Sequence, residues 1–364
     1  MSDYKQAGVD VAGEGAALAG LLGWVNKTHA HRREREPGHV AHGAGYFAGV
    51  VELGGLLGLA VAADGVGTKL LVAQLCDRYD TVGIDLVAMN VNDLVCVGAE
   101  PLTFLDYVAV EALDNAQLEA IGKGLYEGAR QAGVTIAGGE LAQIGAMLKG
   151  VAPGKAFDLA GVAIGKVNLD QVNLGQAVEP GDVVVGWASS GIHSNGLSLA
   201  RRALLEQAGL SVDDPLPGGG GETVGDALLE PTRIYVEPAL RLLGEPKVRV
   251  SALAHITGGG FANMGRISAP CGYVLDKLPP IPPVFEAIRA AGQVSSPDLH
   301  DAYNLGVGFT VTVRPGGQDR ALEIGREAGF EAWILGRATA DPQRRVKLPQ
   351  RGLVSGEHGF QESK

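Results

Sequence analysis

The segment DGVGTK, Asp64 to Lys69, places an acid, a glycine turn and a lysine directly after the apolar run LLGLAVAA. A Walker-type phosphate loop, G-x-x-x-x-G-K-[ST], with Gly67 as its second glycine needs a glycine where Ala62 stands and a lysine where Thr68 stands. The segment is therefore not a Walker loop. It remains a turn at which backbone can approach a ligand closely, with an acid in front of it.

A second group of acids lies in TVGIDLVAMNVNDLVCVG, which predicts a helix that is apolar nearly all round and hence buried on most sides. At helical spacing, Asp85, Asn92 and Asp93 share one arc of this helix. Burying an unpaired carboxylate is costly, so this arc must meet cations, hydrogen-bond donors or a water-filled cleft. Two interpretations stay open: structural carboxylates that meet an arginine or the backbone, or a magnesium site to which Asp64 adds a ligand.

The stretch SSGIHSNGLS lies where a strand is expected to give way to a helix that begins at Ser194 or Asn195. The free N–H groups at a helix start attract anions. Ile192 occupies the first glycine position of G-x-S-x-G, so the stretch is not a nucleophile elbow. The alternative is an ordinary N-cap turn with a surface histidine. The polar residues of this turn are Ser189, Ser190, His193, Ser194 and Asn195.

Two further glycine-rich turns carry polar residues. IAGGELAQIGAM places Glu140 after two glycines, and AHITGGGFAN places His255 and Thr257 before three more. Such turns are common at strand ends without any function. Together with DGVGTK and SSGIHSNG, however, they make four such turns in one chain, and this number favours a ligand site.

A chain of 364 residues exceeds the size at which one hydrophobic core keeps growing, so we expect two domains. The strands and helices that must position the residues above predict that both domains are α/β. We place the domains at 1–172 and 173–345, on either side of the turn VEPGD, and expect a flexible polar tail over 346–364. In the first half we expect a helix over 14–28, a glycine-rich loop from His42, a hairpin around Gly54-Gly55 and a helix over 115–132. In the second half we expect strands at 183–188, 249–256, 307–314 and 331–337 and helices at 195–208, 283–291 and 318–328.

Composition argues against several classes of partner. The net charge of −11 disfavours binding to a polyanion such as nucleic acid. Three cysteines without C-x-x-C spacing disfavour a disulfide framework and a structural zinc site. The apolar run from Leu53 to Ala63 is too short to span a bilayer, and the start MSDYKQ is polar. We therefore expect a cytoplasmic protein without a membrane partner.

Taken together and in order, DGVGTK, GIDLVAMNVNDL, GAEPLTFLDY, SSGIHSNG, PTRIY and HITGGGF resemble the phosphoribosylformylglycinamidine cyclo-ligase (aminoimidazole ribonucleotide synthetase) family. The resemblance runs from Tyr4 to about residue 338. It implies a homodimer whose N-terminal sheets join into a barrel, with an ATP site in the N-terminal domain. The implied reaction closes the imidazole ring of formylglycinamidine ribonucleotide in purine biosynthesis, uses ATP and Mg²⁺, and releases ADP and phosphate.

The resemblance also implies a role for each group of residues. The implied metal ligands are Asp64, Asp93 and Glu140. The implied nucleotide-binding residues are Asp64, Gly65, Gly67, Thr68 and Lys69, with Lys27, Gly43 and Gly45 in a glycine-rich cover that runs to Gly49. The implied substrate cradle is Ser189, Ser190, His193, Ser194 and Asn195. His193 is expected to transfer a proton, and Lys69 to face phosphate.

The chain departs from the family pattern at one turn, and this departure keeps other functions in view. Where the family typically reads GGETAEMPGM, this chain has Leu141, Gln143 and Gly145 in place of a hydroxyl, a carboxylate and a proline. The alternatives are another ATP-using enzyme of the same superfamily, such as a thiamine-monophosphate kinase, a selenophosphate synthetase or the amidotransferase-coupled synthetase one step earlier, and a nucleotide-binding homologue without turnover. The absence of an apparent Cys-Lys pair near the N-terminus disfavours selenophosphate chemistry.

Overall fold

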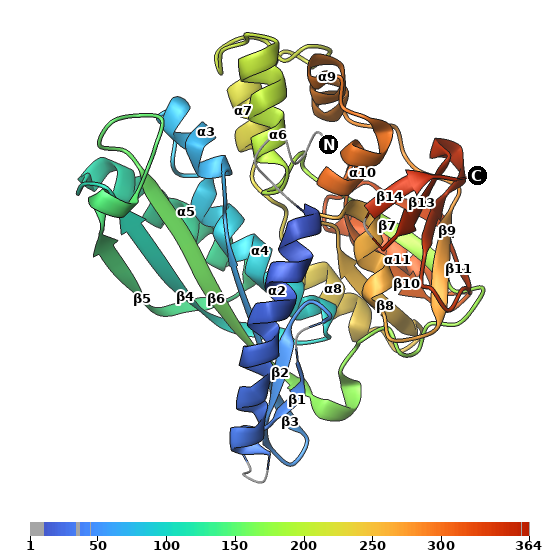
Figure 1. The fold of residues 1–364 in the computed structure, drawn as a ribbon. Helices are drawn as coiled ribbons and strands as arrows, with labels where there is room; N and C mark the ends of the chain where they lie inside the picture. Colours follow the sequence, from blue (N-terminus) through green and yellow to red (C-terminus); the bar gives the residue numbers. More distant parts are fainter. Residues whose placement is uncertain (1–10, 34–36, 44, 358, 364) are drawn as a thin grey trace.

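Two sheets with helices packed on them make up the fold (Figure 1). The structure is a computed structural model that describes residues 11–33, 37–43, 45–357 and 359–363. Tyr4, where the family resemblance starts, and Ala44 of the glycine-rich loop lie outside these residues. Within them, no helix combines the length and the apolar character needed to cross a membrane.

The first sheet has the strand order β1-β2-β3-β6-β4-β5. The strands are β1 (Val40–His42), β2 (Gly49–Gly54), β3 (Leu57–Gly65), β4 (Glu100–Val110), β5 (Thr135–Gln143) and β6 (Phe157–Asn168). Neighbouring strands are antiparallel except β4 and β5, which are parallel. The hairpin expected around Gly54-Gly55 is confirmed, because β2 and β3 pair on either side of it.

Helix α4 (Val82–Cys96) fills the centre of the molecule. It contacts β3, β4 and β6 of the first sheet, α5 (Asn115–Ala132), and β8 of the second sheet. The approach to α5 depends on small residues, because a Cβ on Gly83 would lie only 2.3 Å from the backbone N of Leu125. The expected burial of this helix on most sides is confirmed, because all of its residues except Ile84 and Asp93 are buried.

The second sheet has the order β14-β13-β12-β9-β11-β7-β10-β8. Its strands are β7 (Val183–Ala188), β8 (Val250–His255), β9 (Cys271–Leu275), β10 (Val307–Val313), β11 (Ala332–Ala340), β12 (Val346–Leu348), β13 (Leu353–Gly356) and β14 (Gly359–Glu362). Only β12 and β9 are parallel. The four expected strands are present, and β7, β8, β10 and β11 pair antiparallel. The sequence did not reveal β9, a short strand.

The helices of the second half lie on both sides of the central helix α4. They are α6 (Leu197–Arg201) with a π-helical continuation over Arg202–Gln207, α7 (Val224–Leu229), α8 (Val236–Leu243), α9 (Pro283–Gly292), α10 (Ser296–Ala302) and α11 (Gln318–Glu327). The helix α11 packs on β7 and β11, while α8 contacts both α11 and α4. On the other side, α7 contacts α3 (Lys69–Leu75), which follows the DGVGTK turn.

Each hydrophobic core draws residues from both halves of the chain. One cluster joins Leu86 and Phe104 of the first half to Leu197 and Phe285 of the second. The other gathers the second sheet around Trp187 and also includes Val95 of α4. Residue 172, the expected boundary, lies in the connection between β6 and β7. The two sheets therefore share packed interfaces along α4, and the site elements are held in fixed positions.

The C-terminal segment is ordered, so the expected flexible tail over 346–364 is wrong for its described residues. The strands β12, β13 and β14 extend the second sheet. Leu353 and Phe360 are buried, and the backbone N of Phe360 donates to Asp301 Oδ1 of α10 at 2.8 Å. The composition of the tail is mostly polar, and this misled the prediction, because the two buried apolar residues Leu353 and Phe360 hold the tail on the second sheet.

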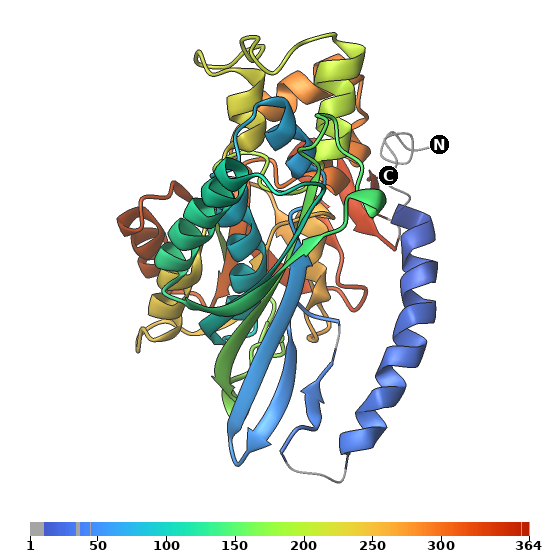
Figure 2. The same cartoon turned by 90° about the vertical axis from the view of Figure 1, so that its left-hand side faces the viewer.

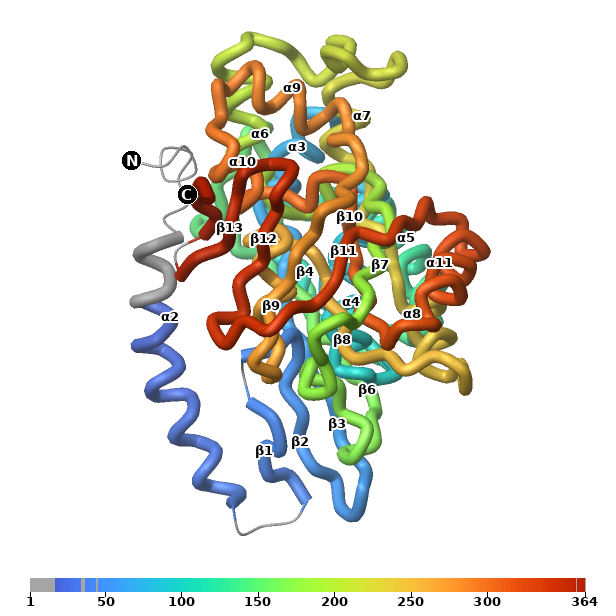
Figure 3. The backbone as a smooth tube through the Cα atoms, turned by 90° about the vertical axis from the view of Figure 1, so that its right-hand side faces the viewer, coloured from blue at the N-terminus to red at the C-terminus, as the bar shows by residue number. Residues whose placement is uncertain are grey.

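The N-terminal helix α2 (Val11–Val25) continues as the 3-10 helix η1 (Asn26–Arg32), close to the helix expected over 14–28. Figures 2 and 3 show α2 standing beside the edge of the molecule, along the strands β1 to β3. Its side chains Leu18, Leu21 and Trp24 are exposed. In this single chain, α2 thus presents an apolar stripe that nothing within the described residues covers.

Candidate active site

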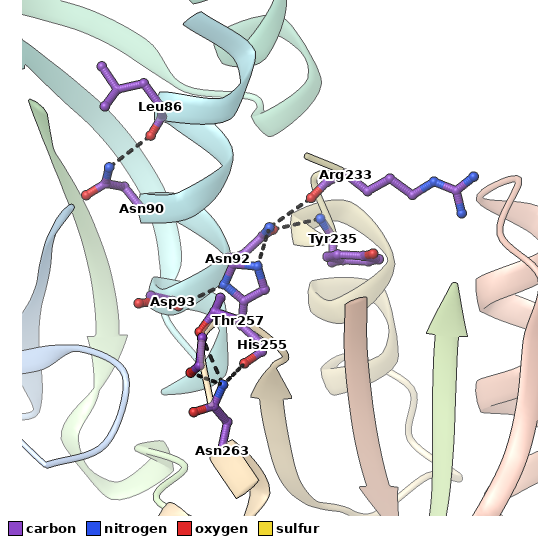
Figure 4. A network of polar contacts seen from close by, with 10 residues as sticks. Leu86, Asn90, Asn92, Asp93, Arg233, Tyr235, His255, Thr257 and Asn263 are labelled. Atoms are coloured by element: carbon purple, nitrogen blue, oxygen red, sulfur yellow. Dashed lines mark hydrogen bonds and ion pairs between the residues drawn. The ribbon is translucent and has the colours of Figure 1, made fainter. Parts of the chain in front are cut away.

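Several motifs of the sequence meet at α4. Asn92 joins this helix to the segment PTRIY: its Nδ2 donates to the carbonyl O of Arg233 at 2.8 Å, and its Oδ1 accepts from the backbone N of Tyr235 at 2.8 Å. Figure 4 shows these bonds beside the imidazole of His255, which ends β8. The helix, the segment PTRIY and the turn after β8 therefore form one polar network.

Asp93 is held by a histidine. His255 Nδ1 lies 3.0 Å from Asp93 Oδ1 (Figure 4), and the imidazole is fully buried while the carboxylate is 22 % exposed. The second ring nitrogen, Nε2, lies 3.4 Å from Asn92 Nδ2. The imidazole thus fixes one carboxylate oxygen of Asp93 and leaves the other side of the group facing the solvent.

Asp64 and Asn90 add oxygen atoms beside Asp93. Asn90 Nδ2 donates to the carbonyl O of Asp64 at 3.3 Å and to that of Leu86 at 2.9 Å, while its Oδ1 is buried and accepts no hydrogen bond from the described residues. Desolvation raises the pKa of Asp64 above its usual value, and the negative charge of Asp93 adds to this rise. Carboxylate and amide oxygens are the ligands that Mg²⁺ prefers. The unpartnered Oδ1 and the mutual repulsion of the two acids fit a divalent cation at this place.

Sequence reasoning missed Asn90. The available signal was its position three residues before Asp93, which places both side chains on the same face of α4.

Glu140 does not join Asp64 and Asp93 within one chain, so the expected three-acid metal site is not assembled. Asp64 pairs with Gly161, Gly161 with Asp106 and Asp106 with Gly139, so Glu140 lies three strands away and one residue out of register. Three strand spacings amount to about 14 Å, and adjacent residues of a strand point to opposite faces. In the part of the chain that the structure describes, no three His, Cys, Asp or Glu side chains are grouped as metal ligands.

Lys69 also differs from its expected place. Its side chain is fully buried, and its Nζ lies 2.9 Å from Asp85 Oδ1, 3.1 Å from the carbonyl O of His193 and 2.6 Å from that of Glu230. Burial lowers the pKa of this ammonium, an effect that the charge of Asp85 opposes. Lys69 therefore points into the protein, because a buried carboxylate and two carbonyls attract it more than solvent does.

Asp85 is a structural carboxylate, the first of the two interpretations of the α4 acids. Its Oδ1 also accepts from the backbone N and the Oγ1 of Thr232, at 2.8 and 2.6 Å. The acids on the shared arc of α4 thus divide: Asp85 faces the interior and Asp93 faces the cleft.

The turn SSGIHSNG carries a run of unpartnered polar atoms. His193 Nδ1, Ser194 Oγ and Asn195 Nδ2 are all buried, and none has a hydrogen-bond partner in the part of the chain that the structure describes. The helix α6 begins only at Leu197, after Gly196 in the left-handed conformation, so the expectation that a helix starts at Ser194 or Asn195 is wrong. A buried polar group without a partner is costly. These three consecutive groups fit a polar ligand that supplies the missing partners.

His193 is buried rather than a surface histidine. Its ring Nε2 accepts a hydrogen bond from the backbone N of Ser190 at 3.3 Å, which assigns the ring proton to Nδ1. Desolvation lowers the pKa of His193 well below its usual value, and the positive charges of His255, Lys69 and Arg233 act in the same direction. The imidazole is therefore neutral near pH 7.

Two residues that sequence reasoning missed support this turn. Asn304 Oδ1 accepts from Ser189 Oγ at 2.9 Å, and Asn304 Nδ2 donates to the carbonyl O of Gly191 at 2.9 Å. Tyr303 Oη donates to the carbonyl O of Gly196 at 2.9 Å. Nothing in the local sequence HDAYNLG sets Tyr303 and Asn304 apart, because their partners lie about a hundred positions away in the chain.

The candidate nucleotide turn and the candidate substrate turn touch. Thr68 Oγ1 lies 3.0 Å from Ser198 Oγ of α6. On the other side, Asn195 borders the TGGG turn, where a Cβ on Gly258 would lie 3.3 Å from Asn195 Oδ1. Thr68, Ser198 and Asn195 therefore bring three of the four glycine-rich turns into one place.

The expected nucleotide cover, a separate glycine-rich loop with Lys27, lies with the N-terminal segment. Lys27 Nζ is 3.7 Å from the ring centroid of Trp24, and a Cβ on Gly43 would lie 3.2 Å from His29 Cε1. Gly45 follows Ala44, which the structure does not describe. The described contacts of Lys27 and Gly43 are thus with η1 and α2 rather than with Asp64.

Comparison with known proteins adds to this geometry. Residues 45–167 match the family described as AIR synthase related protein, N-terminal domain, and residues 179–349 match its C-terminal domain. The chain is 45 % identical over 339 residues to a phosphoribosylformylglycinamidine cyclo-ligase of Methanothermobacter thermautotrophicus, covering 93 % of this chain and 95 % of the relative. It is 41 % identical to one of Pyrococcus horikoshii, covering 97 % of this chain and all of the relative. The chain belongs to the phosphoribosylformylglycinamidine cyclo-ligase family.

Solved structures share the fold of this cyclo-ligase family member at low sequence identity. A thiamine-monophosphate kinase from Stenotrophomonas maltophilia superposes with a TM-score of 0.59 at 22 % identity, covering 89 % of this chain and 95 % of the kinase. The hydrogenase maturation protein HypE in complex with ATP gives 0.57 at 19 % identity, with 86 % of each chain covered. The family resemblance stated from the six motifs is therefore confirmed, and the two sheets are those of this fold.

Proposed function

We propose that this chain catalyses the ATP-dependent ring closure of formylglycinamidine ribonucleotide to aminoimidazole ribonucleotide, with release of ADP and phosphate. The observation that carries the proposal is that the candidate nucleotide site and the candidate substrate site are in contact, through Thr68 and Ser198. An oxygen cluster of Asp64, Asn90 and Asp93 suits a cation with nucleotide phosphates, and the turn of His193 to Asn195 offers three unpartnered polar atoms to a second ligand. A phosphoryl-transfer site needs such neighbours, because its catalysis is mostly positioning and charge neutralisation.

The reaction has one chemical obstacle. The formyl oxygen is a poor leaving group until a phosphoryl group is placed on it, after which attack by the internal nitrogen closes the ring and expels phosphate. Bound Mg²⁺ neutralises phosphate charge in such transfers. We assign Asp64, Asn90 and Asp93 to holding the cation, with His255 fixing the orientation of Asp93. Glu140 takes no part in this assignment within one chain.

The substrate turn supplies hydrogen bonds. Ser194 and Asn195 face the ligand with a hydroxyl and an amide, supported from behind by Ser189 and Ser190, whose hydroxyls donate to Asn304 Oδ1 and to the carbonyl O of Pro231. His193 stays neutral and carries its proton at Nδ1, so it acts as a hydrogen-bond donor to the reacting oxygen rather than as a strong base. Gly65, Gly67 and Thr68 line the nucleotide side of the contact.

We further propose that the chain works as a homodimer in which the first sheets of two copies join into a barrel. The edge strand β5 is exposed on both faces, and no strand of the described residues pairs with its outer edge. The large apolar side chains Leu105, Tyr107, Ile136 and Leu141 of β4 and β5 are exposed. An open edge flanked by apolar side chains is a hazard in a monomer and is suited to pairing with another sheet.

Release of ADP by the purified chain, with Mg·ATP and with or without formylglycinamidine ribonucleotide, tests the function. We expect ADP release that depends on the ribonucleotide and forms one aminoimidazole ribonucleotide per ADP. Release stimulated by thiamine monophosphate instead would assign the chain to the kinase alternative. Nucleotide binding without release in either assay would indicate a homologue that has lost turnover, the alternative motivated by Leu141 and Gln143.

A further inference from the structure

Lys69 has no proton left for a phosphate. An ammonium has three N–H donors and no acceptor. The Nζ atom contacts three groups inside the protein, namely the Asp85 carboxylate, the carbonyl O of His193 and the carbonyl O of Glu230, and the side chain has no exposed surface. The ordinary role of a lysine beside a phosphate turn therefore does not describe this one.

The contact with His193 explains what the buried ammonium does. His193 adopts a left-handed backbone conformation with φ of 58°, which a residue with a Cβ rarely holds without support. Lys69 holds its carbonyl at 3.1 Å, while the backbone N of Ser190 holds its ring Nε2 at 3.3 Å. Fixing both the carbonyl and the ring sets the direction of the other ring nitrogen, Nδ1, which has no hydrogen-bond partner among the described residues.

The same ammonium joins the substrate turn to its surroundings. Asp85 binds both Lys69 and Thr232, and Glu230 offers its carbonyl two residues before Thr232. Lys69 also follows Thr68, whose hydroxyl lies 3.0 Å from Ser198. The nucleotide turn, the helix α4, the substrate turn and the segment PTRIY are thus connected through one buried ion pair.

We propose that Lys69 is a positioning residue that acts through His193 and makes no contact with phosphate. The role in turnover rests on the proposed ring-closure function. The buried ion pair of Lys69 and Asp85 keeps the substrate turn in a fixed place against the nucleotide turn, so that the two bound reactants meet in a productive geometry.

A double variant tests this role without leaving a buried charge. Lys69→Met alone would strand the carboxylate of Asp85, and that variant could fail to fold. Lys69→Met combined with Asp85→Asn removes both charges and keeps an oxygen that accepts from Thr232. Lys166→Met, which breaks an exposed pair with Glu100, serves as the matched control.

We expect the double variant to lower kcat about 100-fold, the order of loss that misplaced reactants cause. Its dissociation constant for Mg·ADP, measured by calorimetry, should stay within about twofold of the wild-type value. For Lys166→Met, both kcat and this dissociation constant should stay within about twofold of wild type. A loss of nucleotide affinity of about tenfold or more in the double variant would show a direct phosphate contact and overturn the proposal. Wild-type kcat in the double variant would overturn it as well.

A spectroscopic measurement separates this proposal from the proposed function. In chain labelled with ¹⁵N-histidine, the ring signals of His193 are those that His193→Gln removes. We expect them to report an Nδ1–H tautomer in the wild type and to shift or broaden in the double variant. If the wild type showed no ribonucleotide-dependent ADP release, the function would fail, and the spectrum would still decide on Lys69. Unchanged His193 signals in the double variant contradict its positioning role.

Discussion

At the residue scale, burial decides which acid and which base takes part in chemistry. Asp85 and Asp93 lie on one helix, but Asp85 is enclosed with Lys69 while Asp93 reaches the cleft beside His255. Sequence spacing predicted their common arc and could not separate them, because the partners come from β8 and from the segment PTRIY. The same holds for Lys69, whose two carbonyl partners lie more than a hundred residues further along the chain.

Replacing Asp93 by Asn tests its assignment to the cation. The variant keeps the shape of the side chain and an acceptor for His255 but loses a negative charge, so we expect Mg²⁺-dependent nucleotide binding to weaken about tenfold or more. Calorimetry with Mg·ADP measures the nucleotide affinity, and thermal unfolding checks that the fold is intact. Asp170→Asn, at an exposed acid, should change neither the affinity nor the unfolding temperature. Unchanged nucleotide affinity in Asp93→Asn would remove this residue from the metal site.

Removing the imidazole of His193 tests the substrate turn. His193→Ala deletes the donor at Nδ1, and loss of one donor that stabilises a developing charge costs about 100-fold in kcat. We expect this loss in steady-state ADP release, with affinity for Mg·ADP nearly unchanged. Equal losses in kcat and in nucleotide affinity would mean that the substitution disturbs the whole site.

At the element scale, long regular segments were predictable and their contacts were not. The hairpin of β2 and β3 and the buried helix α4 followed from local pattern, because glycine pairs and apolar periodicity are local signals. The C-terminal strands β13 and β14 did not, because their two apolar anchors, Leu353 and Phe360, are buried only in the core of the second sheet, where β14 contacts α10. The supports of the substrate turn, Tyr303 and Asn304, were missed for the same reason.

Phe360→Ala measures the contribution of the C-terminal strands. Phe360 is buried, so its removal should lower the free energy of unfolding by about 3 kcal/mol. Gln361→Ala, at the next and exposed position, should change it by less than about 0.5 kcal/mol. Urea unfolding monitored by circular dichroism gives both values. Equal effects of the two substitutions would mean that β14 adds little to stability.

Asp301, whose carboxylate accepts a hydrogen bond from the backbone N of Phe360, should make the free energy of unfolding depend on pH. Burial raises the pKa of Asp301 to about 6, against about 3.9 in an unfolded chain. The folded state therefore binds more protons between these values, and the free energy of unfolding falls as pH rises toward 6. Asp301→Asn lacks this loss, so relative to wild type it should gain about 1–2 kcal/mol between pH 5 and pH 8. Urea unfolding at the two pH values checks the sign, and a relative loss would contradict it.

At the scale of the whole molecule, a single chain leaves apolar surface exposed. The exposed edge of β5 and the exposed apolar side chains of β4 belong to the first sheet, and α2 with its apolar stripe stands beside the other end of that sheet, along β1 to β3. The sequence resemblance implied a homodimer, and the surface of a single chain agrees with a partner that covers this face. Local sequence could not predict it, since exposure depends on which face of the sheet the helices α4 and α5 leave open.

Leu105→Glu tests the dimer. A charge on the open face of the first sheet should prevent a second sheet from packing there, so we expect the variant to sediment as a monomer where the wild type sediments as a dimer. Tyr126→Glu, on the exposed face of α5, should leave the dimer intact. A monomeric wild type, or a dimer that survives Leu105→Glu, would place the interface elsewhere.

The central claim is that the oxygen cluster on β3 and α4 receives the nucleotide phosphates while the turn of His193 receives the second substrate. A crystal structure with Mg²⁺, a non-hydrolysable ATP analogue and formylglycinamidine ribonucleotide tests it most directly. We predict that the cation lies on Asp64 and Asp93, that the ribonucleotide bonds to Ser194 and Asn195, and that no phosphate touches Lys69. A triphosphate bound away from Asp64 and Asp93, or seated on Lys69, would contradict the account.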